Sequence, residues 1–305
     1  MSEPAAPLIQ GGARDPAYRN RAGRRSTLVS IVVNLILTIG QITVGIVSGS
    51  QGLVADGVHT LSDLVSDFVV LWAGQHSGKG PDADHAYGHQ RYENAATLAL
   101  GVLLLLVGVG MLWAALQKIQ APQSVQSVQV IALWVALATV VAKESLFRYM
   151  LAIATRLRSS MLIANAWHAR SDAASSLVVV VGIGGNLLGV PLLDPIAALV
   201  VGLMVMRMGW KFFWNSLNDL MDRAVSTDEL AAIHATLSAT PGVLGIHELR
   251  TRKMGDMTMV DVDLEINAHQ TVAEGHAIAL AARQRVMAQH NVLDVMTHVD
   301  PVEPM

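Results

Sequence analysis

Residues 52–67 read GLVADGVHTLSDLVSD, an apolar stretch that carries four ionisable side chains. At about 100° per residue, Asp56, His59, Asp63 and Asp67 fall within about 80° of one another around a helix. Carboxylates buried in hydrocarbon without a partner are costly, and ionisable groups at membrane depth usually mark a function. The stretch therefore predicts a membrane helix with one polar stripe, around which the rest of the chain is organised.

The same pattern returns 109 residues later, where residues 162–176 read LIANAWHARSDAASS. His168 and Asp172 repeat the spacing of His59 and Asp63, so each copy carries H-x-x-x-D. Two such helices that face each other would gather two imidazoles and two carboxylates, a donor set for a tetrahedral divalent metal. A single copy could be a His or Asp that hydrogen-bonds a neighbouring membrane helix, but two matched copies favour a metal site.

The composition is typical of a membrane protein. Of the 305 residues, 52% are hydrophobic and 15% are charged, and the mean hydropathy is +0.43. A soluble chain carries about 25% charged residues. The net charge of −3, without a basic surface pattern, argues against a nucleic-acid partner. Because the chain has no cysteine, any metal must be held by imidazole and carboxylate. No prosthetic group is predicted.

Apolar segments of the length needed to cross a bilayer, about 20 residues, occur along the first two thirds of the chain. They cover about residues 27–48, 52–75, 94–116, 128–149, 162–188 and 195–213. We expect residues 26–214 to form a six-helix transmembrane bundle, preceded by a cytoplasmic tail at residues 1–25, which lack the apolar core of a signal peptide. Lys143 and Glu144 interrupt the fourth segment, where snorkelling or a mutual pair would accommodate them.

Basic residues gather in alternate connecting segments. They lie in the tail, in the loop with Lys79 and Arg91, and in the loop with Arg148, Arg156 and Arg158, whereas the intervening loops are nearly uncharged. Because positive charge favours the cytoplasmic side, both termini are predicted to lie in the cytoplasm, with the helices surrounded by lipid of the cell membrane.

Residues 215–305 are richer in charge and predict a cytoplasmic α+β domain. Helices are expected at 227–239 and 272–289, and strands at 243–253, 257–267 and 292–299. In the second strand, apolar residues alternate with Asp261, Asp263 and Glu265, as in a strand with one buried face. The αββαβ order, with antiparallel pairing, is typical of a ferredoxin-like module.

These features together make the sequence similar to the cation diffusion facilitator family over about residues 27–301. The resemblance implies a homodimer that exports divalent cations from the cytoplasm, usually in exchange for protons, with the cation as substrate and regulator. The implied transport site is His59, Asp63, His168 and Asp172. Many bacterial members have Asp at the position of His59, and the histidine form resembles zinc-selective members more. Zinc is therefore the expected ion, with Fe²⁺, Co²⁺, Ni²⁺, Cd²⁺ or Mn²⁺ as the alternatives.

The resemblance implies two further features near the membrane domain. In residues 81–93, PDADHAYGHQRYE, the positions of Asp82, His85 and His89 match a loop that binds a second metal, although histidines that cap helices would explain the pattern equally well. Arg91 and Asp222 match a charge pair that hinges the dimer. The alternative for this pair is an ordinary exposed charge, which contributes about 0–1 kcal/mol.

In the soluble domain the resemblance implies a metal site made by His247, Asp263, His276, His298 and Asp300. The position of Asp263 is His in zinc-binding members, so this site would be weaker, hold one metal, or prefer ions that favour oxygen ligands. For Asp263 alone, a solvated strand face explains the residue as well as metal ligation does.

The functional hypothesis is alternating access, in which the site binds a cation from the cytoplasm and releases it outward to protons. Histidine suits this exchange because its reference pKa of about 6.5 lets it trade a metal for a proton near neutral pH. One alternative is a membrane metalloenzyme, since His85-x-x-x-His89 resembles one histidine box of a desaturase. Another is a non-transporting metal sensor. The single box, the lack of H-E-x-x-H and the paired H-x-x-x-D favour a transporter that is not an enzyme.

Overall fold

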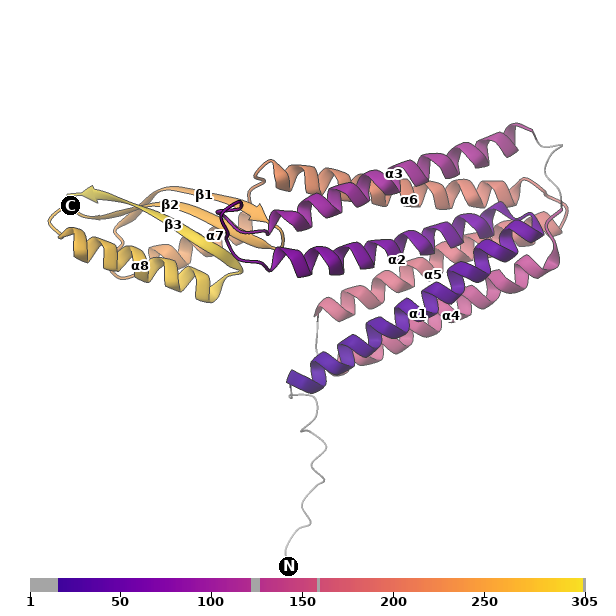
Figure 1. Ribbon diagram of the computed structural model, residues 1–305, viewed down its shortest axis with the longest axis horizontal. Helices are drawn as coiled ribbons and strands as arrows, with labels where there is room; N and C mark the ends of the chain where they lie inside the picture. The colour runs from indigo at the N-terminus through magenta and orange to yellow at the C-terminus, as the bar shows by residue number, and fades with distance from the viewer. Residues whose placement is uncertain (1–15, 122–126, 158–159, 304–305) are drawn as a thin grey trace, which may run out of the picture. The chain divides into compact units, whose positions relative to one another are not determined.

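The computed structural model of the protein describes residues 16–121, 127–157 and 160–303 (Figure 1). Six long helices occupy the predicted apolar segments. They are α1 (Pro16–Ser48), α2 (Gln51–Ser77), α3 (Arg91–Gln120), α4 (Val130–Leu157), α5 (Ser160–Leu187) and α6 (Leu193–Leu220). Residues 1–15 of the predicted tail lie outside the described residues. Residues 16–25 of that tail belong to α1, because arginine favours a helix and a helix need not end where its apolar segment does.

Four of the described helices are long and apolar enough to cross a membrane. These segments are Leu28–Ser48, Arg91–Gln120, Val130–Arg156 and Leu193–Leu220. Helices α2 and α5 are not among them, and they carry the two ionisable stripes, which lower the hydropathy of a segment. Large apolar side chains such as Ile36, Leu106 and Trp134 are exposed. An exposed apolar surface on long helices is the surface that lipid would cover.

The chain divides into two compact units. The first combines residues 1–67 with 103–209, and in it α4 packs along α5 and α1 packs along α4 (Figure 1). Its core contains Leu53 of α2, Val179 of α5 and Val201 of α6. Gly108 of α3 allows a close helix contact, because a Cβ atom there would lie 2.9 Å from the Cβ of Met206. Asp56 and His59 of the α2 stripe are therefore buried inside a packed helix bundle.

The second unit contains residues 68–102 and 210–305, and ends in a small sheet domain. Its elements are α7 (Thr227–Ser238), β1 (Gly245–Met254), β2 (Met257–Asn267), α8 (Val272–Gln289) and β3 (Val292–Val302). The strand order is β1-β2-β3, with β1 antiparallel and β3 parallel to β2. The predicted αββαβ order is present. The prediction of antiparallel pairing is confirmed for β1 and wrong for β3. Helix α8 returns the chain to the end of the sheet where β2 began, so β3 runs in the same direction as β2.

One face of this sheet is buried and the other carries acids. Val260, Val262 and Leu264 of β2 are buried in a cluster with side chains of α7 and α8, and Figure 1 shows α8 lying along the sheet. Asp263 and Glu265 alternate with them and are only partly covered. The period of two predicted for this strand therefore holds, and it leaves carboxylates on the outer face.

Candidate metal centre

Helix α2 carries the first ionisable stripe, and its start is held by a carboxylate from α6. Asp194 accepts hydrogen bonds from the Ser50 hydroxyl (2.6 Å) and from the backbone N–H groups of Gln51 (2.7 Å) and Gly52 (3.2 Å). Ser50 in turn accepts from the N–H of Leu53 (3.1 Å). The first turn of a helix has free N–H groups and a positive dipole end, so it stabilises the buried Asp194 carboxylate. Gly52 leaves room for it, since a Cβ there would lie 3.0 Å from the carboxylate.

Two turns further along α2, three of the four predicted transport ligands come together. His59 Nδ1 lies 3.9 Å from an Asp63 oxygen and His59 Nε2 lies 3.8 Å from an Asp172 oxygen of α5. One ligand atom from each residue lies within 4.8 Å of the others. The His59 side chain is 6% exposed, and its Nδ1 makes no hydrogen bond. An imidazole that lies between two carboxylates and has a buried nitrogen without a hydrogen bond can coordinate a divalent cation.

The fourth predicted ligand, His168, is placed differently. It lies one turn before Asp172 on α5, but its side chain is exposed, and the cluster within the described residues does not include it. A cavity of about 10 Å³ adjoins the cluster and is lined by Asp63, Asp172, Thr60 and other side chains. This is about the space that one water molecule needs. The cluster thus offers one imidazole and two carboxylates, with a small cavity beside them.

Asp56, one turn before His59 in the same stripe, belongs to a different set of contacts. It accepts hydrogen bonds from the Gln41 amide of α1 and from the Ser176 hydroxyl of α5 (2.7 Å). Lys143 of α4 places its ammonium 3.5 Å from the carboxylate and donates to Ser176 (2.8 Å). All four side chains are buried, with Asp56 1% and Lys143 3% exposed. We call these four residues the Asp56 network.

The expectation for Lys143 was wrong in both of its forms. The side chain neither snorkels nor pairs with Glu144, which instead pairs with Arg148 at 2.9 Å. The reason is that a buried ammonium is most stable beside an equally buried carboxylate, and Asp56 supplies one from another helix. The sequence signal was present, because a lysine in an apolar helix and a spare aspartate in the stripe each need a partner.

The loop before α3 gathers its three predicted ligands. Asp82 accepts hydrogen bonds from the backbone N–H groups of His85 (2.8 Å) and Asp84 (3.1 Å). The carboxylate lies 3.4 Å from His85 Nδ1 and 3.3 Å from His89 Nε2. The N–H of His85 holds the pKa of Asp82 below its ordinary value, so the carboxylate stays ionised in mild acid. From the sequence alone, metal ligation and helix capping explain these histidines equally well. Because both histidines face Asp82, the geometry favours metal ligation.

The structure places Arg91 and Asp222 in an ion pair at the end of α6. Arg91 also donates to the Leu220 carbonyl (3.3 Å). Asp222 has a left-handed backbone, with φ of 60°, and the N–H of Arg223 bonds the Asn218 carbonyl (3.1 Å) across it. These are the features of a Schellman motif with Asp222 at the left-handed position, which terminates the helix.

The predicted ligands of the soluble domain are only partly assembled. His298 Nε2 lies 3.2 Å from an Asp300 oxygen on β3, and Asp263 is the register partner of His298 on β2. His276 of α8 lines a pocket together with His298, whereas His247 lies at a β1 bulge. Within residues 225–303 no three of these side chains form a cluster of ligand atoms. One chain therefore presents these ligands on an open surface.

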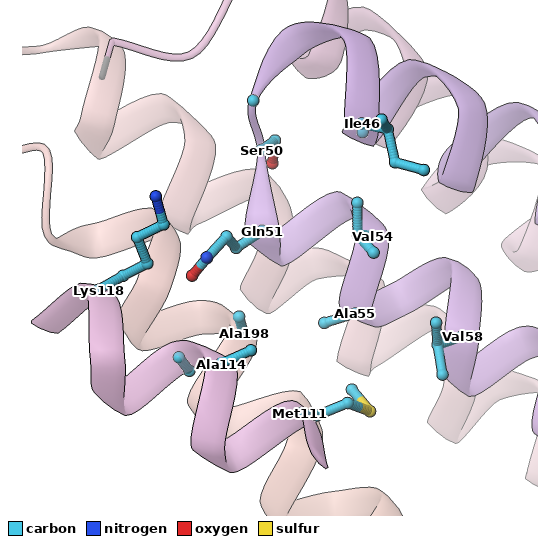
Figure 2. A pocket seen from close by; sticks show the side chains of 13 residues that line it. Ile46, Ser50, Gln51, Val54, Ala55, Val58, Met111, Ala114, Lys118 and Ala198 are labelled. Atoms are coloured by element: carbon cyan, nitrogen blue, oxygen red, sulfur yellow. The ribbon is translucent and has the colours of Figure 1, made fainter. Parts of the chain in front are cut away.

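A second hollow in the helix bundle has a different character. A pocket of about 370 Å³ lies between α1, α2, α3 and α6 (Figure 2). Figure 2 shows Val54, Ala55 and Met111 beside it, with Lys118 at one side. Its described lining contains no carboxylate or imidazole, the side chains that form the predicted metal sites.

Comparison with protein families decides the identity. A model of the cation efflux transmembrane domain matches residues 27–221, and a model of the cation efflux protein cytoplasmic domain matches residues 225–302. The chain belongs to the cation efflux family. This family, the cation diffusion facilitators, consists of metal transporters and not of enzymes, so the metalloenzyme alternative is set aside.

Relatives of this cation efflux protein include transporters from plants and bacteria. Metal tolerance protein C1 of Arabidopsis thaliana is 32% identical over 92% of this chain, which spans 62% of that protein's length. The manganese efflux system protein MneP of Bacillus subtilis (strain 168) is 31% identical over 93% of this chain and 97% of MneP. Among solved structures, a nickel form of the MamM C-terminal domain matches 26% of this chain and all of that domain, with 20% identity and a TM-score of 0.25.

Proposed function

We propose that the protein exports a divalent metal cation from the cytoplasm by alternating access through α2 and α5. The convergence of His59, Asp63 and Asp172 on one buried point carries this proposal. Two carboxylates supply two negative charges, which a divalent cation balances. An imidazole with carboxylates suits borderline to hard divalent ions.

His168 supplies the fourth ligand in this proposal, because it lies one turn from Asp172 on the same helix. A small movement of α5 relative to α2 would bring it to the ion and complete a tetrahedral set. Metal binding displaces protons, since imidazole and carboxylate coordinate in their deprotonated forms. Release of the cation to protons on the far side makes the cycle an antiport.

The topology that fits this cycle has six membrane spans, with residues 26–214 in the bilayer and both termini in the cytoplasm. Support comes from the family match over residues 27–221 and from the basic loops on one side. Helices α2 and α5 can span because their stripes face the ion path rather than lipid. Residues 215–305 form a ferredoxin-like cytoplasmic domain, through which two copies pair as a homodimer in the cell membrane.

In such a dimer, the soluble-domain ligands form a regulatory metal site. His298 and Asp300 already lie 3.2 Å apart on an open strand face, and His276 shares a pocket with His298. Loss of His247 together with His298 should therefore change the response of transport to cytoplasmic metal. Transport that keeps its metal response in this double variant would remove the regulatory role.

Zinc is the ion that we propose, because a buried imidazole lies at the centre of the cluster. Manganese is the second candidate. Two of the three clustered ligands are carboxylates, which suit Mn²⁺, and the relative MneP is named for manganese efflux.

The deciding experiment is metal uptake into proteoliposomes under an imposed pH gradient, with Zn²⁺, Mn²⁺, Fe²⁺, Co²⁺, Ni²⁺ and Cd²⁺ in turn. Asp63→Ala should abolish the flux because it removes one of two charges that balance the ion. Asp256→Ala, at an exposed turn between β1 and β2, should transport like the native protein. Native flux in Asp63→Ala would exclude this site. Flux for none of the ions would favour the metal sensor, and flux indifferent to the gradient would remove proton coupling alone.

A further inference from the structure

We propose that Lys143 determines ion specificity by keeping Asp56 out of the metal site. The inference deepens the proposed function and rests on the transport site of His59, Asp63 and Asp172. Within the part of the chain that the structure describes, Lys143 makes no ion pair or hydrogen bond with these ligands, so it is a positioning residue that acts through Asp56.

Asp56 has the position of a further metal ligand. It precedes His59 by one helical turn on the stripe of α2, and its side chain is 1% exposed. An unpaired carboxylate here, surrounded by apolar helix packing, would be drawn to a divalent cation on the neighbouring turn. The ion would then meet three carboxylates and one imidazole.

The Asp56 network prevents this. One Asp56 oxygen accepts from both Gln41 and Ser176, and the other, without a hydrogen bond, lies 3.5 Å from the Lys143 ammonium. Helices α1, α4 and α5 thus hold the Asp56 carboxylate from three sides. Lys143 also lines the small cavity beside Asp63 and Asp172, so the same side chain contacts Asp56 and adjoins the metal cluster.

The charge balance shows what this arrangement does. Asp56 and Lys143 neutralise each other, so the cluster keeps only the two negative charges of Asp63 and Asp172 for a divalent ion. Without Lys143, a third carboxylate would strengthen the binding of every divalent cation. The gain would be larger for ions that prefer oxygen, such as Mn²⁺, than for Zn²⁺, which also accepts nitrogen. Lys143 therefore favours release and favours ions that bind imidazole.

The test measures Zn²⁺ and Mn²⁺ flux in proteoliposomes of the full-length protein, and separates KM from the maximal rate. Lys143→Met should lower KM for both ions, lower the maximal rate because release slows, and raise the Mn²⁺ to Zn²⁺ ratio of kcat/KM at least about tenfold. Lys143→Arg keeps the charge and should keep the native ratio. Asp56→Asn frees the ammonium beside the cluster and should raise KM instead.

The double variant Asp56→Asn/Lys143→Met separates charge from packing. A buried ion pair can often be replaced by neutral residues without loss, so this variant should return to the native ratio. A double variant that keeps the shifted ratio, or Lys143→Met with the native ratio, would overturn the proposal. If Lys143→Met does not fold, the opposite effect expected of Asp56→Asn still decides: a KM that does not rise overturns it. Loss of flux in Asp63→Ala with no change of preference in these variants would refute this inference and leave the proposed function standing.

Discussion

Replacing Asp194 with alanine should destabilise the helix bundle by about 2–4 kcal/mol. The structure supplies the magnitude. The N–H groups of the partly buried Gln51 and the buried Gly52 lose their acceptor, at about 1–3 kcal/mol each, and the Ser50 hydroxyl loses a bond of 2.6 Å. Removal of a buried carboxylate returns part of this cost. Asp194→Asn keeps one oxygen acceptor and should cost about half as much.

The assay for Asp194 is equilibrium unfolding of the purified full-length protein in mixed micelles with increasing sodium dodecyl sulfate, followed by circular dichroism. Hydrogen exchange should also accelerate in Asp194→Ala at the amides of Gln51 and Gly52. A general loss of packing would instead accelerate exchange at other amides as well. Asp256→Ala, a matched change at an exposed turn, should stay within about 0.5 kcal/mol of the native protein. Equal stability of Asp194→Ala and the native protein would refute the argument that α6 caps α2.

Two further predictions concern the second unit. The pKa of Asp82 is lowered by the N–H of His85. The ionised carboxylate therefore adds to the folding stability of the loop at every pH above the ordinary aspartate pKa, and this stabilisation is lost as the pH falls through the depressed pKa. Carbon-13 NMR of labelled aspartate should therefore show Asp82 titrating below the ordinary aspartate pKa, and a midpoint at or above that value would contradict this. Asp222→Asn keeps a residue type that tolerates the left-handed backbone and should cost at most about 1 kcal/mol, whereas the β-branched Asp222→Val should cost about 1–3 kcal/mol. Equilibrium unfolding in mixed micelles measures both losses of stability. A larger loss for Asp222→Asn than for Asp222→Val would contradict this explanation.

Periodicity predicted the elements that depend on local sequence. All six apolar segments lie in helices, and β2 and α8 have the predicted bounds, because burial of one face leaves a pattern in the chain itself. The stripe of α2 likewise placed Asp56 and His59 on one face. What the stripe does not encode is which of its carboxylates binds a metal, because that depends on groups that other helices bring.

Lys143 and His168 show this dependence. Asp56 forms an ion pair with Lys143, which lies 87 positions away in the sequence. No spacing rule links the two residues. His168 repeats the spacing of His59, yet it is exposed while His59 is buried, so an identical motif has two environments. The parallel pairing of β3 was within reach, since the α8 connection is long enough for a crossover, whereas a short turn would have required antiparallel strands.

Asp222 has a consequence for how this protein can vary. Its backbone needs a residue that accepts a left-handed conformation, which favours glycine, asparagine or aspartate, and its partner Arg91 needs a negative charge. Glutamate satisfies only the second need, and glycine and asparagine satisfy only the first. Although its side chain is half exposed, Asp222 should therefore accept fewer neutral substitutions than most residues of the buried core, where one aliphatic side chain can often replace another.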